Sequence, residues 1–330
     1  MALGSAPLQI PVRDAEKHAQ VLRRFRFIDQ IFKALTRTSA IAVLVVLAGV
    51  MLSLVIGSLP TWRAFGFEFF TSESWNPVTE KFGALPAIYG TIITSAIAML
   101  IGVPVSFGIA IFLTEICPDR LRRTISTAIE LLAGIPSIIY GIWGLFVFAP
   151  FLQAHLQPLL IDTFANVPVL NQLFAGPPYG IGLLTAGLIL AIMVLPFITS
   201  ITREVFETVP PVLKEAAYGI GCTRWEVIRR VVLPYTRVGV IGGVMLGLGR
   251  ALGETMAVTF IIGNAHRIMP SIMAPGTTIS ASIANEFTEA TGELYTSALI
   301  ALGLILFFIT FTVLAAARLM LIRIDQKAGV

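Results

Sequence analysis

Two charged residues lie inside a long apolar run, and their types and spacing suggest anion chemistry. Arg250 and Glu254 occur in the string GLGRALGETMAV at 247 to 258. If this string is helical, the two side chains are one turn apart, face the same side and can pair. A guanidinium binds phosphate-type oxygens bidentately because its donors form a planar fork. Arg250 is therefore a candidate anion ligand, with Glu254 holding or releasing it.

The same pair also has a purely structural explanation, an ion pair that braces a helical bundle. Either charge left unpaired in mid-bilayer would cost about 2.5–3.5 kcal/mol on the insertion scale. Pairing lowers that cost, but two apolar residues would remove it altogether. The residues alone leave both explanations open.

The elements that must position this pair are membrane helices. The chain has 330 residues, of which 56% are hydrophobic and only 13% charged, whereas soluble domains carry about 25% charged residues. The apolar residues form long runs, each able to cross ~30 Å of hydrocarbon at ~1.5 Å per helical residue. We therefore predict an all-α integral membrane protein with six transmembrane helices, at 39–59, 88–116, 125–151, 179–201, 238–263 and 295–320. Pro104 makes the second run either one kinked helix or a span with a short continuation.

The basic residues predict the orientation. With a basic N-terminal tail (1–38) inside, nineteen Lys and Arg fall on the inner side and three on the outer side. The positive-inside rule then places both termini, 1–38 and 321–330, in the cytoplasm and the loop 60–87 outside. The net charge of +4 thus reflects topology and not nucleic-acid binding. The second half of the tail has helical apolar spacing, and is either a membrane-surface helix or a short solvated one.

Other polar and small residues in the spans are weaker signals. Pro136 can kink the third span, where Ser137 and Tyr140 are candidates either for the pathway or for helix packing. Glycines four apart in the fifth span form two ladders, Gly239, Gly243 and Gly247, and then Gly249 and Gly253. They predict close helix approach and a central place in the bundle.

The inner loop 212–234 predicts a docking surface for a soluble partner. Its string KEAAYGIGCTRWEVIRRVVLP reads as two short helical stretches joined at Gly219 to Gly221, and Pro234 is expected to end the second. A plain amphipathic connector is the alternative. The order glutamate, two alanines, glycine and Leu-Pro resembles the EAA loop of ABC importer permeases; the matching residues are Glu215, Ala216, Ala217, Gly221, Leu233 and Pro234. The one departure is Val231, where that family usually has isoleucine.

Three further strings make the chain similar to the permeases of the bacterial phosphate-specific transport system. They are GLGRALGETMAV at 247–258, LLAGIPSIIYG at 131–141 and FGALPAIYGTIITS at 82–95. With the EAA loop, the resemblance extends from the second predicted span to the sixth, which is about two-thirds of the chain. The polar tail, the added first span and the outer loop with Trp75-Asn76-Pro77 resemble the C-type partner of the two permeases. The resemblance implies a type I ABC importer permease fold with an added N-terminal helix, in the bacterial inner membrane.

The resemblance also implies partners and roles. A second homologous permease, a dimeric ATP-binding subunit and an extracytoplasmic phosphate-binding protein would complete the importer, and Arg250 and Glu254 would serve transport. The chain lacks GxxxxGK[ST], so ATP and Mg²⁺ are expected on the partner subunit. We expect no catalytic, metal or cofactor site, and a membrane lipid environment with no nucleic acid.

The residues alone leave three alternative functions open. A sulfate, molybdate or other oxyanion permease is the nearest, since the choice of phosphate comes from the resemblance. A proton-coupled secondary transporter would use Glu254 as its titrating group, but would have no ATPase for the loop to dock on. A scaffold would not need charges inside a span. The two cysteines, Cys117 and Cys222, are expected on the inner side as reduced thiols.

Overall fold

The computed structural model describes residues 12 to 327, so residues 1–11 and 328–330 of the predicted tails lie outside it. The chain divides into two compact units, residues 1–56 and 57–330. The described part of the first unit belongs to one helix, α1 (Val12–Phe65), whose last residues are in the second unit. The predicted boundary between tail and first span at residue 38 is therefore not a break, because the helix is continuous through it.

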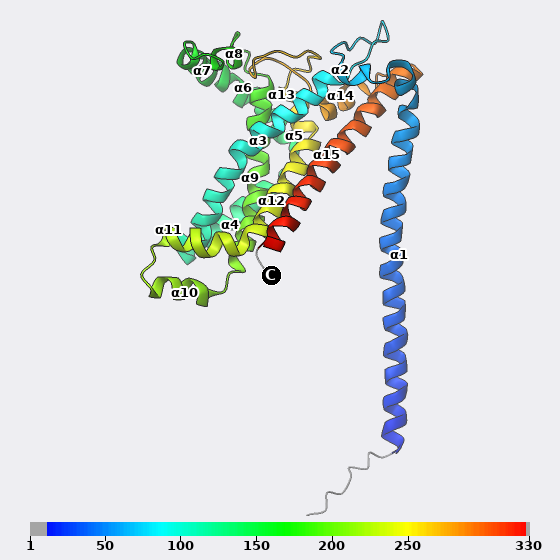
Figure 1. Ribbon diagram of the computed structural model, residues 1–330, viewed down its shortest axis with the longest axis vertical. Coiled ribbons are helices and arrows are strands. Elements are labelled where there is room, and N and C mark those ends of the chain that lie inside the picture. Colours follow the sequence, from blue (N-terminus) through cyan, green and yellow to red (C-terminus); the bar gives the residue numbers. More distant parts are fainter. Residues whose placement is uncertain (1–11, 328–330) are drawn as a thin grey trace, which may run out of the picture. The chain divides into compact units, whose positions relative to one another are not determined.

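The six predicted membrane helices are confirmed in number. Among residues 12–327, the helices that are long and apolar enough to span a membrane are Phe25–Phe65, Leu85–Ile116, Ser137–Phe164, Leu183–Glu207, Arg224–Gly253 and Glu293–Leu319 (Figure 1). The α-helices after α1 are α2 (Glu68–Thr71), α3 (Leu85–Ile111), α4 (Asp119–Ala133), α5 (Ser137–Trp143), α6 (Ala149–Phe151), α7 (Gln157–Phe164), α8 (Leu170–Leu173), α9 (Leu183–Glu207), α10 (Pro211–Gly219), α11 (Arg224–Val227), α12 (Leu233–Gly253), α13 (Met256–Ile261), α14 (Ile279–Glu286) and α15 (Glu293–Lys327). The described residues contain no strand, only an isolated bridge between Asn76 and Lys81.

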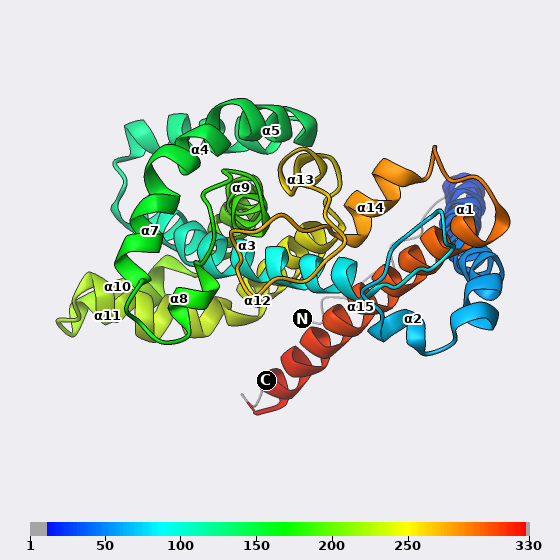
Figure 2. The ribbon, with the colours of Figure 1, turned by 90° about the horizontal axis from the view of Figure 1, so that it is seen from above.

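Helix α9 is the centre of the second unit. It is surrounded by α3, α5, α12 and α13 (Figure 2), and it is the most buried of the six candidate spans. The prediction that the fifth span is central is therefore wrong for this chain; α12 packs on the side of α9. The predicted glycine ladder makes this contact, because Cβ atoms at Gly239, Gly243 and Gly247 would lie 2.7–2.8 Å from side chains of α9.

A π-helical turn precedes a proline at four places in the chain. Each of the four π-helical turns, at Phe112–Ile116, Gly144–Phe148, Leu152–Leu156 and Ile228–Val232, ends two residues before a proline. The residue just before each proline donates its N–H to a carbonyl five residues back. A proline in a regular helix clashes with the carbonyl four residues back, and one wide turn relieves this where the helix continues, at Pro150, Pro158 and Pro234. At Pro118 the helix ends instead, because Cys117 is extended.

This wide turn corrects one prediction about the inner loop. Pro234 does not end the second helical stretch, because the π turn at Ile228–Val232 carries the helix from Arg224 through to Gly253. Pro104 likewise lies within the single helix α3. Proline is tolerated here by local adjustment instead of termination.

Two predicted spans are broken in the structure. The predicted span 125–151 is interrupted between Ala133 and Ser137, where Gly134 and Pro136 separate α4 from α5. The amphipathic α4 is not among the six candidate spans, which instead include Ser137–Phe164. The predicted span 238–263 is interrupted at Glu254 and Thr255, between α12 and the short α13.

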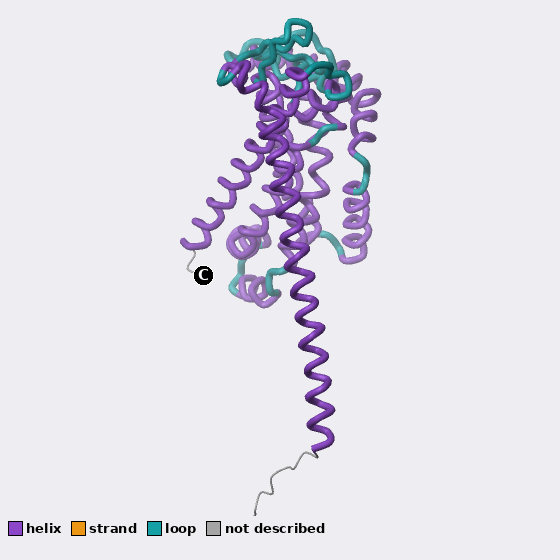
Figure 3. The backbone as a smooth tube through the Cα atoms, turned by 90° about the vertical axis from the view of Figure 1, so that its right-hand side faces the viewer, coloured by secondary structure: helices purple, strands orange, loops and turns teal. Residues whose placement is uncertain are grey.

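The two ends of the second unit are formed by different sets of segments. The predicted inner segments α10 and α11 lie at one end, and α2, α8 and α14 lie at the other (Figure 1). Most of the loops of this unit gather at the α2–α14 end (Figure 3). There a cluster of buried residues joins α2, α3, α14 and α15, with Phe69 and Phe82 at its core. The alternation of inner and outer loops predicted from charge thus has its counterpart in space.

Candidate functional site

Arg250 is in the last turn of α12, and its side chain is exposed. The exposed face of α12 continues one turn earlier with Leu246, which is 58% exposed. The guanidinium acts electrostatically on Tyr140 of α5, so the structure brings together the candidate residues from the third and fifth predicted spans. A cation near the C-terminus of a helix is also favoured by the helix dipole.

Glu254 does not pair with Arg250, which corrects the prediction of a one-turn helical pair. Helix α12 ends at Gly253, and Glu254 is extended with φ −69° and ψ 131°. The i, i+4 geometry that would align the two side chains is therefore absent. Glu254 Oε1 instead accepts a hydrogen bond from the backbone N–H of Ala257 at 3.3 Å. This satisfies one of the free N–H groups at the start of α13.

Tyr140 and Ser137 lie just after the break between α4 and α5. The buried Tyr140 hydroxyl donates a hydrogen bond to the carbonyl of Leu132 at 2.9 Å. That carbonyl is in the last turn of α4, where it also accepts a hydrogen bond from the N–H of Ile135 at 3.3 Å. Ser137 is half-buried at the first position of α5. The Tyr140 contact supports the packing role that the sequence left open.

The two helix breaks lie beside each other because glycine allows close packing. A Cβ at Gly141 of α5 would lie 2.9 Å from the Phe260 ring and 3.1 Å from Cα of Ala257, both in α13. A Cβ at Gly144 would lie 3.2 Å from Ile261. The breaks that precede α5 and α13 are thus brought close together by the α5–α13 contact.

The EAA loop forms the predicted pair of helices joined by a turn. Gly221 has φ +90°, a conformation that residues with a Cβ rarely adopt, while a Cβ placed there would meet no atom within 4 Å. The glycine is required by the backbone and not by space. Thr223 then starts α11 with a reciprocal capping box with Glu226.

The loop has one anchored face and one free face. Ala217 is buried with Phe206, Val227 and Val232 in a small core that also includes Ala110 and Val240. Glu215, Ala216 and Gly221 are exposed, Leu233 is half-buried and Pro234 is exposed. Large apolar side chains join the free face, with Ile220 83% and Trp225 61% exposed. The free face is suited to docking, because apolar side chains at this density are normally covered.

Sequence reasoning missed an ion pair that ties this loop to the membrane helices. Lys214 Nζ of α10 lies 2.5 Å from Glu115 Oε1, in the π turn that follows α3, and the side chains are 19% and 7% exposed. Beside it, Arg203 of α9 lies 3.1 Å from Glu130 of α4. Glu115 is the sole charged residue in the predicted span 88–116, and that isolation was the available signal.

A second missed cluster lies at the opposite end of the unit. The Glu286 carboxylate accepts hydrogen bonds from Trp75 Nε1 at 2.6 Å and from the Tyr295 hydroxyl at 2.7 Å. Its other oxygen lies 2.7 Å from His266 Nε2. Burial raises the pKa of the Glu286 carboxyl, but hydrogen bonds from His266 and Tyr295, the His266 charge and the Trp75 hydrogen bond outweigh it and lower that pKa. The cluster joins two loops to α14 and α15.

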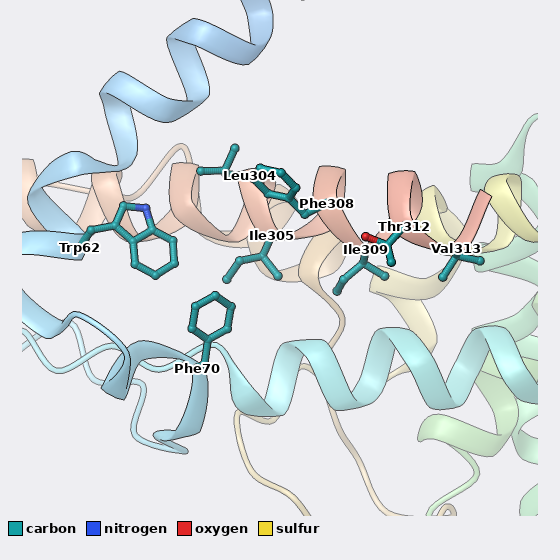
Figure 4. Close-up of a pocket in the computed structure, with 8 residues that line it drawn as sticks. All are labelled: Trp62, Phe70, Leu304, Ile305, Phe308, Ile309, Thr312 and Val313. Atoms are coloured by element: carbon teal, nitrogen blue, oxygen red, sulfur yellow. The ribbon is translucent and has the colours of Figure 1, made fainter. Parts of the chain in front are cut away.

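A large cavity elsewhere in the unit is unsuited to anions. It has a volume of about 450 Å³ and lies between α15 and the segment from the end of α1 to α2. Figure 4 shows its lining of apolar side chains around Trp62, Phe70 and Phe308, with the Thr312 hydroxyl as the one oxygen drawn. Within residues 12–327, no three His, Cys, Asp or Glu side chains gather to hold a metal ion.

Comparison with known proteins defines the class. Residues 102–325 match the family model of binding-protein-dependent transport system inner membrane components. A bacterial alginate ABC transporter chain has a similar fold, with a TM-score of 0.60 and 19% identity over 90% of this chain and 95% of that one. A second alginate importer structure gives 0.55 and 17%, over 89% and 99%. These similarities confirm the predicted ABC importer permease fold.

Curated relatives are much closer in sequence. The phosphate transport system permease protein PstC of Mesorhizobium japonicum is 70% identical, over 97% of this chain and 98% of its own. The PstC protein of Pasteurella multocida is 58% identical, over 92% and 94%. The chain therefore belongs to the family of binding-protein-dependent transport permeases, in the branch of these PstC relatives. It is a multi-pass inner-membrane protein.

Proposed function

We propose that this chain is a membrane-spanning subunit of an ATP-driven, binding-protein-dependent importer that carries inorganic phosphate into the cell. The observation that carries the choice of phosphate is 70% identity, over nearly the full length, to a relative named for phosphate transport. The similarity extends well beyond the short strings 82–95, 131–141 and 247–258, because it covers 97% of this chain.

Arg250 is our candidate for the residue that meets the anion. It is exposed on the chain, and an arginine facing lipid hydrocarbon would be costly. Its face of α12 is therefore best explained as a wall of the pathway, closed by a second homologous permease. Glu254 is engaged at the start of α13, which leaves the guanidinium fork available to phosphate oxygens. Glu254 would then have a positioning role: its hydrogen bond to the N–H of Ala257 would hold the start of α13 in place beside the break that follows Arg250.

The EAA loop is our candidate for the coupling element. A dimeric ATP-binding subunit, which would bind ATP and Mg²⁺, would dock on the free face made by Glu215, Ala216, Gly221 and Ile220. The anchored face, with Ala217 in its core, would pass the movement to α3, α9 and α12. Alternating access follows if ATP binding closes the inner side while an extracytoplasmic binding protein delivers phosphate outside. This assigns the loop and both termini to the cytoplasm.

Two rival functions make different demands. Another tetrahedral oxyanion, such as sulfate or molybdate, would use the same guanidinium chemistry. A proton-coupled transporter would need Glu254 to titrate during transport and would leave the docking face unused. The exposed apolar side chains of that face favour the ATP-driven importer.

The test is uptake by the whole importer in proteoliposomes. Arg250→Gln is expected to abolish ATP-dependent phosphate uptake while the complex still assembles, and Arg250→Lys to retain part of it. Arg318→Gln, which removes another exposed arginine from α15, is the matched control and should leave uptake unchanged. Normal uptake by Arg250→Gln would remove the arginine from the mechanism. Stimulation of ATPase activity by sulfate or molybdate instead of phosphate would reassign the substrate.

A further inference from the structure

Helix α1 is too long for the membrane it is expected to cross. It has 54 residues, Val12–Phe65, which at ~1.5 Å per residue is roughly 80 Å. The hydrocarbon core is ~30 Å thick. The uncharged stretch 39–59 is long enough by itself to cross it. The preceding turns, residues 25 to 38, must therefore lie outside the hydrocarbon although half of them are apolar.

Those turns divide cleanly into two faces. At 100° per residue, Arg26, Lys33 and Arg37 fall on one side of the helix. Lys33 forms an ion pair with Asp29 on that side at 2.7 Å. The opposite half of the helix is apolar and each of its large side chains is 50–66% exposed; they are Phe25, Phe27, Ile28, Ile31, Phe32 and Leu35.

The junction with the membrane span contains a feature that bends helices. The Thr36 hydroxyl donates to the carbonyl of Phe32 at 2.7 Å, and the Ser39 hydroxyl donates to the carbonyl of Leu35 at 2.9 Å. Hydroxyls that bond to the carbonyl four residues back slightly destabilise and often bend a helix. The two bonds lie where the charged amphipathic turns meet the uncharged run, which is where a change of direction would be needed.

We propose that residues 25–38 form a membrane-surface helix that binds the anionic lipid of the cytoplasmic leaflet. The inference rests on the cytoplasmic placement of the N-terminus under the proposed function. A lipid surface fits better than a protein groove, because the apolar face covers half of the helix and not a narrow stripe. The basic side chains at its polar face match the negative headgroups. By lying on the membrane surface, residues 25–38 would set how deeply the first span, residues 39–59, sits in the bilayer.

The experiment measures the depth of two spin labels on the complete importer in vesicles. Labels replace Ile31 on the apolar face and Gln30 on the polar face, in a background in which Cys117 and Cys222 are serine. In vesicles that contain phosphatidylglycerol, the label at 31 should collide mainly with oxygen, and the label at 30 mainly with a water-soluble nickel complex. The contrast should be lost in pure phosphatidylcholine, or when Arg26, Lys33 and Arg37 are all changed to Glu.

Three results would overturn the proposal. Nickel access at both positions in every vesicle means that the helix projects into water. Protection of both labels from both reagents means that a protein covers it. A contrast that persists in phosphatidylcholine means that anionic lipid is not the partner. ATP-dependent phosphate uptake by the same vesicles separates these failures from failure of the proposed function. Reaction of a cysteine at position 30 with an impermeant reagent outside intact cells would overturn the cytoplasmic placement itself.

Discussion

The pair Lys214–Glu115 offers a direct measure of how firmly the coupling loop is held. Glu115 is 7% exposed, Lys214 is 19% exposed, and the charged atoms are 2.5 Å apart. Changing Lys214 to Met leaves the carboxylate buried and unpaired, which costs about 3–5 kcal/mol. Changing both residues, with Glu115→Met as the second substitution, replaces the pair by apolar side chains of similar volume and should be close to neutral. The double variant is therefore expected to be more stable than the Lys214→Met variant.

The assay is the thermal unfolding of the purified complex, followed by ATP hydrolysis and phosphate uptake at a permissive temperature. At about 2 °C for each kcal/mol, a value for large domains, Lys214→Met should lower the midpoint by roughly 6–10 °C. Lys33→Met removes the exposed pair with Asp29, whose side chains are 72% and 55% exposed, and should cost only about 0.3–0.5 kcal/mol. We also expect Lys214→Met to lower phosphate uptake more than it lowers ATP hydrolysis, because α10 would no longer be tied to the π turn that follows α3.

The reasoning fails if Lys214→Met costs no more than Lys33→Met. It also fails if the double variant is as unstable as the single one, since the cost would then come from lost packing and not from an unpaired charge.

Three other predictions follow from local geometry. Gly221→Ala should cost about 1–2 kcal/mol because of its φ of +90° and weaken capture of the ATP-binding subunit in a pull-down, whereas Gly219→Ala, with open space around it, should not. Gly247→Ala should cost about 1–3 kcal/mol by overpacking, since its Cβ would lie 2.7 Å from Ile198; Gly242→Ala, with no atom within 4 Å, should be tolerated in the same thermal assay. The lowered pKa of Glu286 means that its stabilisation is complete above its unfolded pKa of about 4.3 and is lost as the pH falls through the folded value; Glu286→Gln should flatten that acid limb of a plot of unfolding midpoint against pH.

Much of the architecture could be predicted because the bilayer imposes it locally. A span must be long, apolar and internally hydrogen-bonded, so six runs in the sequence became six candidate helices. The EAA loop could be placed because its signature is short and contiguous. The contact of Gly239, Gly243 and Gly247 with another helix could also be predicted, since glycines four apart on a helix leave one groove. The sequence did not show that the helix in this groove would be α9.

The limits lie where a helix stops. Apolar composition alone did not reveal the breaks at Pro136 and Glu254, since a string that is apolar on both sides of a break reads as one span. The assumed pairing of Arg250 with Glu254 depended on an unbroken helix and was wrong for that reason.

From the sequence alone came the membrane class, the number of spans, the position of the EAA loop and the presence of an arginine inside the fifth span. All of these follow from residues that are neighbours in the chain. Only the tertiary structure decided that Glu254 turns to α13, that Lys214 meets Glu115, and that Glu286 collects Trp75, His266 and Tyr295. Those contacts join residues up to 211 positions apart. A buried charge takes whichever partner packing brings within reach, and no periodicity along the chain records that choice.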